Sequence, residues 1–269
     1  MNTIDESILF VPDALALLVN ENAEDDFRIF LATLEHMNVN LPTLYIYTTS
    51  TFPDINYKGK LVINTCLDIY ANLTRKKMES MPSQQGLTNF FHDFTVEKCS
   101  LMKWAIEEHG NGVLFCDADI CWLGPLPSIP KGTSLGLSPH NIRPEDEKKF
   151  GKFNAGFIYM SDLEIVDKWL MESLVSDFFE QLALDEVAKA YSYYTFGFHI
   201  NYGWWRMFQG SVSSEQRKAE WIDLKVKGKP LVCIHTHWKT NDKMTQEFNS
   251  WVFSKIKHMK EYIKILFKE

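Results

Sequence analysis

The sequence lacks any apolar run long enough to cross a lipid bilayer. A transmembrane helix needs roughly 18 or more consecutive and mostly apolar residues, and no uncharged apolar stretch of that length occurs here. The first ten residues also lack the basic segment and the apolar segment of a secretory signal. We therefore expect a protein without a membrane span, and we place it in the cytoplasm.

Cysteine and positive charge are both scarce. The five cysteines are odd in number, and none has zinc-type spacing, because Cys116 and Cys121 have no second pair to accompany them. This pattern indicates buried thiols in a reducing compartment. With 28 basic against 35 acidic residues, the net charge of −7 argues against a broad nucleic-acid surface.

No Ser/Gly/Pro-rich linker, low-complexity segment or internal repeat divides the chain. Its 269 residues, 45% of them hydrophobic, suffice for one large core. We therefore expect a single domain over residues 1–269.

Apolar runs alternate with helical patterns through the first half. The runs at 14–19, 44–47, 61–64 and 113–116 are typical of short buried strands. This alternation predicts an α/β fold with a mostly parallel central sheet flanked by helices.

Capping residues predict where two of the helices begin. We expect Asn22 to cap the first helix, and Thr95 to cap a second helix that ends near Gly110. The polar stretch at 72–93, which lies between these helices, is predicted to be a long loop.

Two aspartates stand where a ligand site is expected. Asp117 and Asp119 directly follow the apolar run 113–116, and the turn residues Gly124 and Pro125 come soon after. Ligands in open α/β sheets bind beyond the carboxyl ends of such strands. Two carboxylates held together there repel one another unless a cation joins them, and a divalent ion that bridges a diphosphate is the usual solution.

A second apolar run ends in histidines. His235 and His237 alternate along a predicted strand, so they share one face. Mixed carboxylate and imidazole ligands suit Mn²⁺ better than Ca²⁺ or Mg²⁺. Lys239 follows directly and is a candidate to neutralise phosphate oxygens. A purely structural role for the histidines is the alternative.

Taken in order, these motifs resemble the nucleotide-diphospho-sugar glycosyltransferases of the GT-A fold, nearest to the retaining, glycogenin-like type. The resemblance rests on Asp117-Ala-Asp119 with the following Ile120-Cys-Trp-Leu-Gly-Pro-Leu, on Phe153-Asn154-Ala-Gly156-Phe, and on Ile234-His235. It implies one GT-A, Rossmann-like domain, with a nucleotide-binding half at 1–130 and a donor-sugar and acceptor half at 131–269. It also implies Mn²⁺ or Mg²⁺, a UDP-sugar donor, a glycan or other hydroxyl acceptor, and retention.

The resemblance further implies roles for single residues. It gives Asp117, Asp119 and His235 to the metal, with His237 in reserve. It gives a donor-binding set, which comprises Lys98, Asp117, Ala118, Asp119, Asn154, Gly156 and Lys239. Glu180, Gln181 and Asp185 are placed at the reacting sugar, although Glu180 stands where the family has aspartate. The ending His235-Thr-His-Trp-Lys239 is also shorter than the family's.

Aromatic residues crowd the segment 191–205. Sugar rings pack their CH faces on such side chains, so Tyr202, Trp204 and Trp205 are candidate acceptor-binding residues. Burial in the core is the competing interpretation.

Three other functions compete with glycosyl transfer. A haloacid-dehalogenase-type phosphatase also has a strand followed by Asp-x-Asp, but usually near the N-terminus. A sugar-1-phosphate nucleotidyltransferase should open with a Gly-rich phosphate loop, which is missing near the first strand. A non-catalytic carbohydrate-binding protein could keep the same fold. The sugar, the base, the acceptor, the stereochemistry and the oligomeric state stay open.

Overall fold

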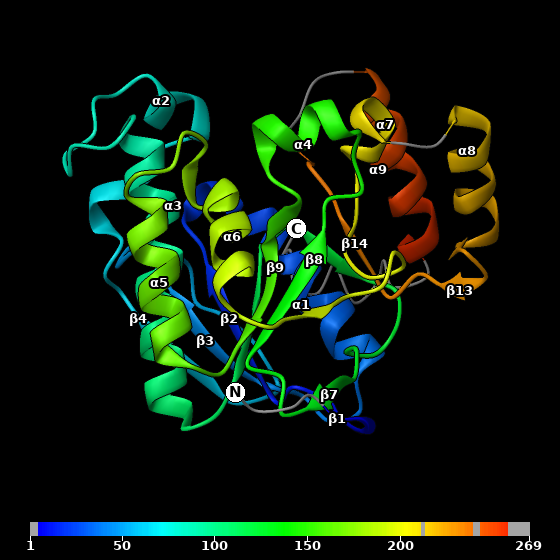
Figure 1. Ribbon diagram of the computed structural model, residues 1–269, viewed down its shortest axis with the longest axis horizontal. Coiled ribbons are helices and arrows are strands. Elements are labelled where there is room, and N and C mark those ends of the chain that lie inside the picture. Colours follow the sequence, from blue (N-terminus) through cyan, green and yellow to red (C-terminus); the bar gives the residue numbers. More distant parts are fainter. Residues whose placement is uncertain (1–4, 211–212, 239–242, 258–269) are drawn as a thin grey trace.

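The protein is described by a computed structural model that covers residues 5–210, 213–238 and 243–257. Its helices and strands form a layered α/β molecule (Figure 1). In chain order the elements are β1 (Asp5–Phe10), β2 (Ala14–Leu18), α1 (Glu24–Met37), β3 (Thr43–Tyr47), β4 (Leu61–Asn64), α2 (Arg75–Glu79), α3 (Phe90–His109), β5 (Val113–Cys116), β6 (Ile120–Trp122), β7 (Ile129–Lys131), β8 (Leu135–Pro139), α4 (Pro144–Phe150), β9 (Phe153–Met160), α5 (Leu163–Ser173), α6 (Phe179–Ala190), β10 (Tyr194–Thr195), β11 (Tyr202–Gly203), α7 (Arg206–Gln209), α8 (Ser214–Asp223), β12 (Lys225–Val226), β13 (Lys229–Pro230), β14 (Cys233–His235) and α9 (Lys243–Ile256).

A seven-stranded sheet in the order β10-β8-β9-β5-β2-β3-β4 forms the centre. Strands β5, β2, β3 and β4 are parallel to one another, and β8 is parallel to β10. Strand β9 runs antiparallel to both of its neighbours, β5 and β8. The predicted α/β class with a mostly parallel sheet is therefore confirmed, with β9 as the reversed strand.

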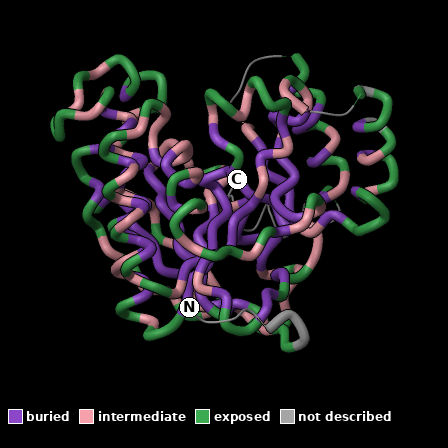
Figure 2. Tube along the Cα trace, in the orientation of Figure 1, coloured by how far each residue is buried: buried purple, intermediate pink, exposed green. Residues whose placement is uncertain are grey.

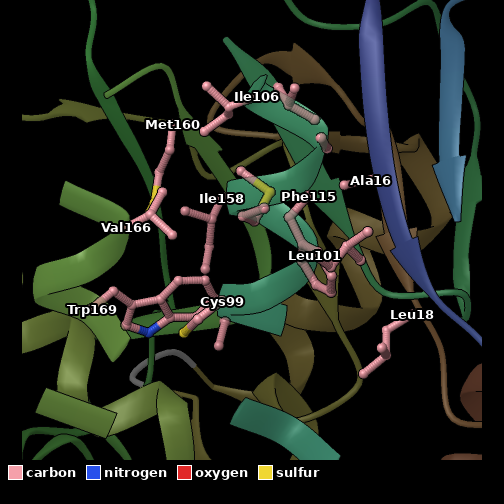
Figure 3. Close-up of a cluster of buried hydrophobic side chains, with 14 of the residues drawn as sticks. Ala16, Leu18, Cys99, Leu101, Ile106, Phe115, Ile158, Met160, Val166 and Trp169 are labelled. Atoms are coloured by element: carbon pink, nitrogen blue, oxygen red, sulfur yellow. The ribbon is translucent and has the colours of Figure 1, made fainter. Parts of the chain in front are cut away.

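Alternating side chains of the central strands build two cores, one on each face of the sheet. Ala16 of β2 and Phe115 of β5 pack with helices α3 and α5 on one face, where Trp169 and Cys99 meet (Figure 3). Leu17 of β2 belongs to the cluster on the other face, which is covered by α1. Both faces of β2 and β5 are thus buried, which explains why their sequences are continuously apolar (Figure 2).

A smaller sheet lies beside the main one and carries the second set of predicted ligands. Its order is β11-β14-β6, and β14 pairs antiparallel with β6. Helices α8 and α9 cover it through Trp221, Phe248 and Val252. In the residues that are described, no helix is long and apolar enough to cross a membrane.

The predicted helix starts were wrong in two places. The side chain of Asn20, not Asn22, makes the capping hydrogen bond, and it caps a short 3-10 turn that precedes α1. Helix α3 begins at Phe90, because the side chain of Asn89 accepts the backbone N–H of His92. Thr95 lies inside this helix, and its hydroxyl donates to the His92 carbonyl instead. The end of α3 at Gly110, with φ 72°, agrees with the prediction.

Candidate active site

Asp117 and Asp119 lie just beyond the carboxyl end of β5, as their sequence position predicts. The Asp117 backbone N–H donates to the Gly156 carbonyl at 2.9 Å, which extends the pairing of β5 with β9 past the strand end. Asp119 then precedes β6, whose partner is β14. The two aspartates therefore stand at the junction of the main sheet and the smaller sheet.

Strand β14 brings the histidines to this junction. The backbone N–H and the hydroxyl of Thr236 both donate to the Asp119 carbonyl, at 3.0 and 2.7 Å. As a result, His235 Nε2 lies 3.0 Å from Asp119 Oδ1 and 3.7 Å from Asp117 Oδ2. His237 Nε2 lies 3.8 Å from Asp119 Oδ2.

These side chains form a set of candidate cation ligands. One ligand atom from each of Asp119, His235 and His237 lies within 4.8 Å of the others. Burial lowers the pKa of His235, but the charges of Asp119 and Asp117 outweigh that effect, so the net shift is upward. The negative charge that draws a proton to His235 also makes the cluster a candidate position for a cation.

Lys98 is the buried cation of the site. Its Nζ lies 3.0 Å from Asp117 Oδ1 and 2.8 Å from Glu180 Oε1. Burial lowers the pKa of Lys98, but the two carboxylates raise it by more, so the ammonium stays charged. Lys98, on α3, therefore links Asp117, which follows β5, to Glu180 of α6.

The backbone is strained at the start of α6, directly before Glu180. The preceding residue, Phe179, has φ 50°, a left-handed conformation that is unfavourable for a bulky side chain. Its ring packs against Phe91 and His92 of α3, which holds the conformation in place. Strain of this kind is typical of functional sites.

Two residues of β9, Asn154 and Gly156, also belong to the site. Asn154 Oδ1 accepts the Gly156 N–H at 3.0 Å, and Asn154 Nδ2 donates to Gln181 Oε1 at 3.2 Å. A Cβ on Gly156 would clash with Asp117 Oδ2 and with the ring of His235. Only glycine lets β9 pass this close to the carboxylates.

Two cavities meet at the ligand cluster. The first, of about 660 Å³, is bordered by Asn20 and Ala23 before α1, by Thr74 beside α2, and by Ala118. The second, of about 550 Å³, is bordered by Asn154 and Gln181 and by several aromatic rings. Residues common to both cavities are Arg75, Phe91, Asp117, His235 and His237.

The predicted donor and acceptor residues divide between these cavities. Ala118 and Asp119 border the first, and Lys98, Asn154, Gly156, Glu180 and Gln181 border the second. Trp204 and Trp205 also border the second cavity. Trp204 packs against His237, with the ring centroids 4.4 Å apart and the ring planes tilted by 39°.

Two predicted site residues lie elsewhere, and a third is not described. Tyr202 is fully buried in the core, where its hydroxyl donates to Glu220, so it borders neither cavity. Core packing explains this aromatic residue, and its assignment to the acceptor site was wrong. Asp185, in the middle of α6, accepts the Lys152 backbone N–H and also borders neither cavity. Lys239 lies outside the described residues.

Several site residues were missed by the sequence analysis. His140 borders the second cavity, with Nδ1 3.1 Å from the Gly151 carbonyl, and its burial lowers its pKa to about 4. Arg75 and Phe91, at the boundary of the two cavities, come from the stretch predicted to be a loop. A signal existed for His140 alone, because it directly follows β8, a strand whose carboxyl end faces the same edge as that of β5.

Comparison with known proteins supports the fold. No protein-family model matches the chain, and no curated protein matches its sequence. The apo glycosyltransferase GlyE of Streptococcus pneumoniae TIGR4 is similar in structure, with a TM-score of 0.53 and 13% identity over 95% of this chain. That match spans only 64% of the GlyE chain. The apo form of mouse xyloside xylosyltransferase 1 is also similar, with a TM-score of 0.51 and 11% identity, over 87% of this chain and 100% of that one. The molecule therefore has a fold that is shared with glycosyltransferases.

Proposed function

We propose that this protein is a metal-dependent glycosyltransferase that moves a sugar from a nucleotide diphosphate, with UDP as the expected nucleotide, to a hydroxyl acceptor. The observation that carries the proposal is the cluster of Asp119, His235 and His237, in which Asp119 borders the first cavity and both histidines border both cavities. A diphosphate bound where the two cavities meet would present its phosphates to the cluster and its sugar to the second cavity.

The reaction cleaves the bond between the anomeric carbon and the diphosphate, so negative charge grows on a phosphate oxygen. A divalent ion held by Asp119, His235 and His237, with Asp117 beside them, would supply charge stabilisation for that leaving group. The cation could be Mn²⁺ or Mg²⁺, and the two imidazoles favour Mn²⁺.

The chain's own residues provide the remaining parts. In the first cavity, Asn20, Asn22 and Ala23 border the space proposed for the nucleoside. In the second, Asn154 and Gln181 are placed to bind hydroxyls of the donor sugar. Trp204 and Trp205 are the proposed acceptor platform.

The ion pairs of the carboxylates in the second cavity favour a mechanism that retains the anomeric configuration of the sugar. An inverting enzyme needs a carboxylate base beside the acceptor hydroxyl. Among the described residues that border the second cavity, the carboxylates are those of Asp117 and Glu180, and both are in ion pairs with Lys98. Both carboxylates are therefore already engaged by the buried ammonium group of Lys98.

A thermal-shift screen of UDP-, GDP- and dTDP-sugars, with and without Mn²⁺, tests the proposal. A ligand at about 100 times its Kd should add roughly 2.7 kcal/mol to the free energy of unfolding. We expect a Mn²⁺-dependent gain with one nucleotide that is lost in Asp119→Asn. Asp167→Asn, which alters a surface ion pair with Lys103, is the matched control and should keep the gain. A chain that none of these donors stabilises would contradict the proposal.

A further inference from the structure

Asn201 joins the proposed metal site to the second cavity through buried hydrogen bonds. Its side chain is fully buried, and its backbone has φ 54°. The amide lies between two site residues: Oδ1 is 3.1 Å from His235 Nδ1, and Nδ2 is 3.0 Å from Asn154 Oδ1. Nδ2 also lies 3.1 Å from Ser138 Oγ.

Two backbone groups, the Phe150 carbonyl and the Gly156 N–H, determine which side-chain atoms donate and which accept in these hydrogen bonds. Gln181 lies 2.6 Å from the Phe150 carbonyl, which can only accept, so the nearby atom is the NH₂ group of Gln181. The oxygen of Gln181 then accepts from Asn154 Nδ2. The Gly156 N–H, which can only donate, independently fixes the oxygen of Asn154.

The orientation of Asn154 in turn fixes the orientation of the Asn201 amide and the ring nitrogen of His235 that carries a hydrogen. Because Asn154 presents an oxygen to Asn201, the facing atom of Asn201 must be its NH₂ group. The oxygen of Asn201 therefore faces His235 Nδ1, which must carry a hydrogen. The nitrogen left to exchange a proton for a cation is Nε2, and Nε2 faces Asp119.

We propose that Asn201 is a positioning residue that keeps the hydrogen of His235 on Nδ1 and so presents Nε2 to a divalent cation. The inference rests on the proposed cation site. A partner that orients a ligating histidine raises its basicity, and losing such a partner typically weakens metal affinity about 10- to 100-fold. Since Asn201 also holds Asn154, it couples the cation to the residues proposed for the donor sugar.

Mn²⁺ affinity provides the first test, measured by titration calorimetry on the folded protein. Asn201→Gly removes the amide without backbone strain, because glycine accepts φ 54°. We expect Mn²⁺ affinity to fall about 10- to 100-fold. Asn72→Gly is the matched control, since Asn72 is exposed and has φ 56°, and it should bind Mn²⁺ like the wild type.

The tautomer of His235 provides the second test and needs no metal. In the Asp119→Asn variant, a neutral amide at position 119 can rotate to meet either ring nitrogen. ¹⁵N-histidine NMR of the neutral ring should then find the hydrogen on Nδ1, and adding Asn201→Gly should remove that preference. Adding Asn201→Asp instead should preserve it, because a carboxylate still accepts from Nδ1.

The outcomes separate this inference from the proposed function. If the wild type binds no Mn²⁺, the proposed metal site is contradicted. The NMR measurement still tests whether Asn201 sets the tautomer of His235. A hydrogen on Nε2 in Asp119→Asn, or a tautomer that Asn201→Gly leaves unchanged, overturns the inference. If Asn201→Gly does not fold, Asn201→Asp decides alone, since it would shift the tautomer only if the amide were oriented the other way.

Discussion

The two cavities are built in different ways. The first is bordered mostly by short local segments, such as residues 18–26 and 73–79, which follow strands or begin helices. The second is bordered by side chains from α3, β9, α6 and the segment 204–209, which are joined by buried polar contacts. The first cavity therefore depends on where backbone segments end, and the second depends on ion pairs and amide contacts between distant elements.

The largest expected effect comes from removing the ammonium group of Lys98, which joins Asp117 and Glu180 in the second cavity. Lys98→Ala leaves Asp117 and the buried Glu180 without their shared partner. Breaking a buried ion pair typically costs about 3–5 kcal/mol of the free energy of unfolding. We expect a loss of that size in urea unfolding.

Helix α3 also supplies a control for Lys98. Lys103 pairs with Asp167 at the surface, where an ion pair contributes about 0–1 kcal/mol. Lys103→Ala should therefore change the unfolding free energy little. Equal losses in the two variants would show that the second cavity does not depend on its buried ion pairs.

A pH-dependent effect should follow from His140 in the second cavity. Burial lowers its pKa to about 4 from an ordinary value of 6.5. The unfolded chain therefore takes up a proton below pH 6.5, whereas the folded protein does so only near pH 4, and stability falls across this interval. The loss should approach about 3 kcal/mol.

Unfolding of the wild type and of His140→Gln at pH 7 and pH 4 measures that contribution. The wild type should lose about 3 kcal/mol more than the variant between the two pH values. Parallel pH profiles would instead mean that folding leaves the pKa of His140 unchanged.

The smallest expected effects distinguish the roles of the two cavities. Ala118→Leu adds bulk to the first cavity. Overpacking typically costs about 1–3 kcal/mol, so the donor KM should rise about 5- to 140-fold while the acceptor KM stays constant. Ala219→Leu, at an exposed position on α8, should leave both constants unchanged.

Trp204→Ala should give the opposite pattern. Losing one aromatic contact of about 0.5–1.5 kcal/mol should raise the acceptor KM about 2- to 10-fold and leave the donor KM constant. Trp251→Ala, which removes a ring stacked on Trp221 away from both cavities, serves as its control. If both cavity variants changed the same constant, the assignment of the nucleoside to the first cavity and of the acceptor to the second would be wrong.

Sequence patterns predicted the sheet and one edge of the site well. Buried strands have continuous apolar sequences, and Asp117 follows such a strand, so its place at the edge of the sheet could be inferred from local order alone. The helix starts were less predictable, because Asn20 and Asn22 are the same residue type, and Asn89 and Thr95 are both of types that commonly cap helices. Their backbone conformations decided between them.

The second cavity could not be predicted to the same extent. Lys98 and Glu180 meet because α3 and α6 pack on the same face of the sheet, and no local spacing encodes that contact. Tyr202 and Trp204 are two residues apart in one aromatic segment, yet one is in the core and the other borders a cavity. Composition could not separate them, since burial depends on the pairing of β11 with β14.

The bond from Thr236 to Asp119 spans 117 residues of the chain. Contacts of such long sequence separation form slowly, because their loop-closure entropy is lost before the contact is gained. The parallel pairs β2–β3 and β3–β4 and the packing of α3 can form earlier, from segments closer in sequence. Ligand-binding competence should therefore appear last during refolding, when β14 docks against β6 and the histidines reach the carboxylates.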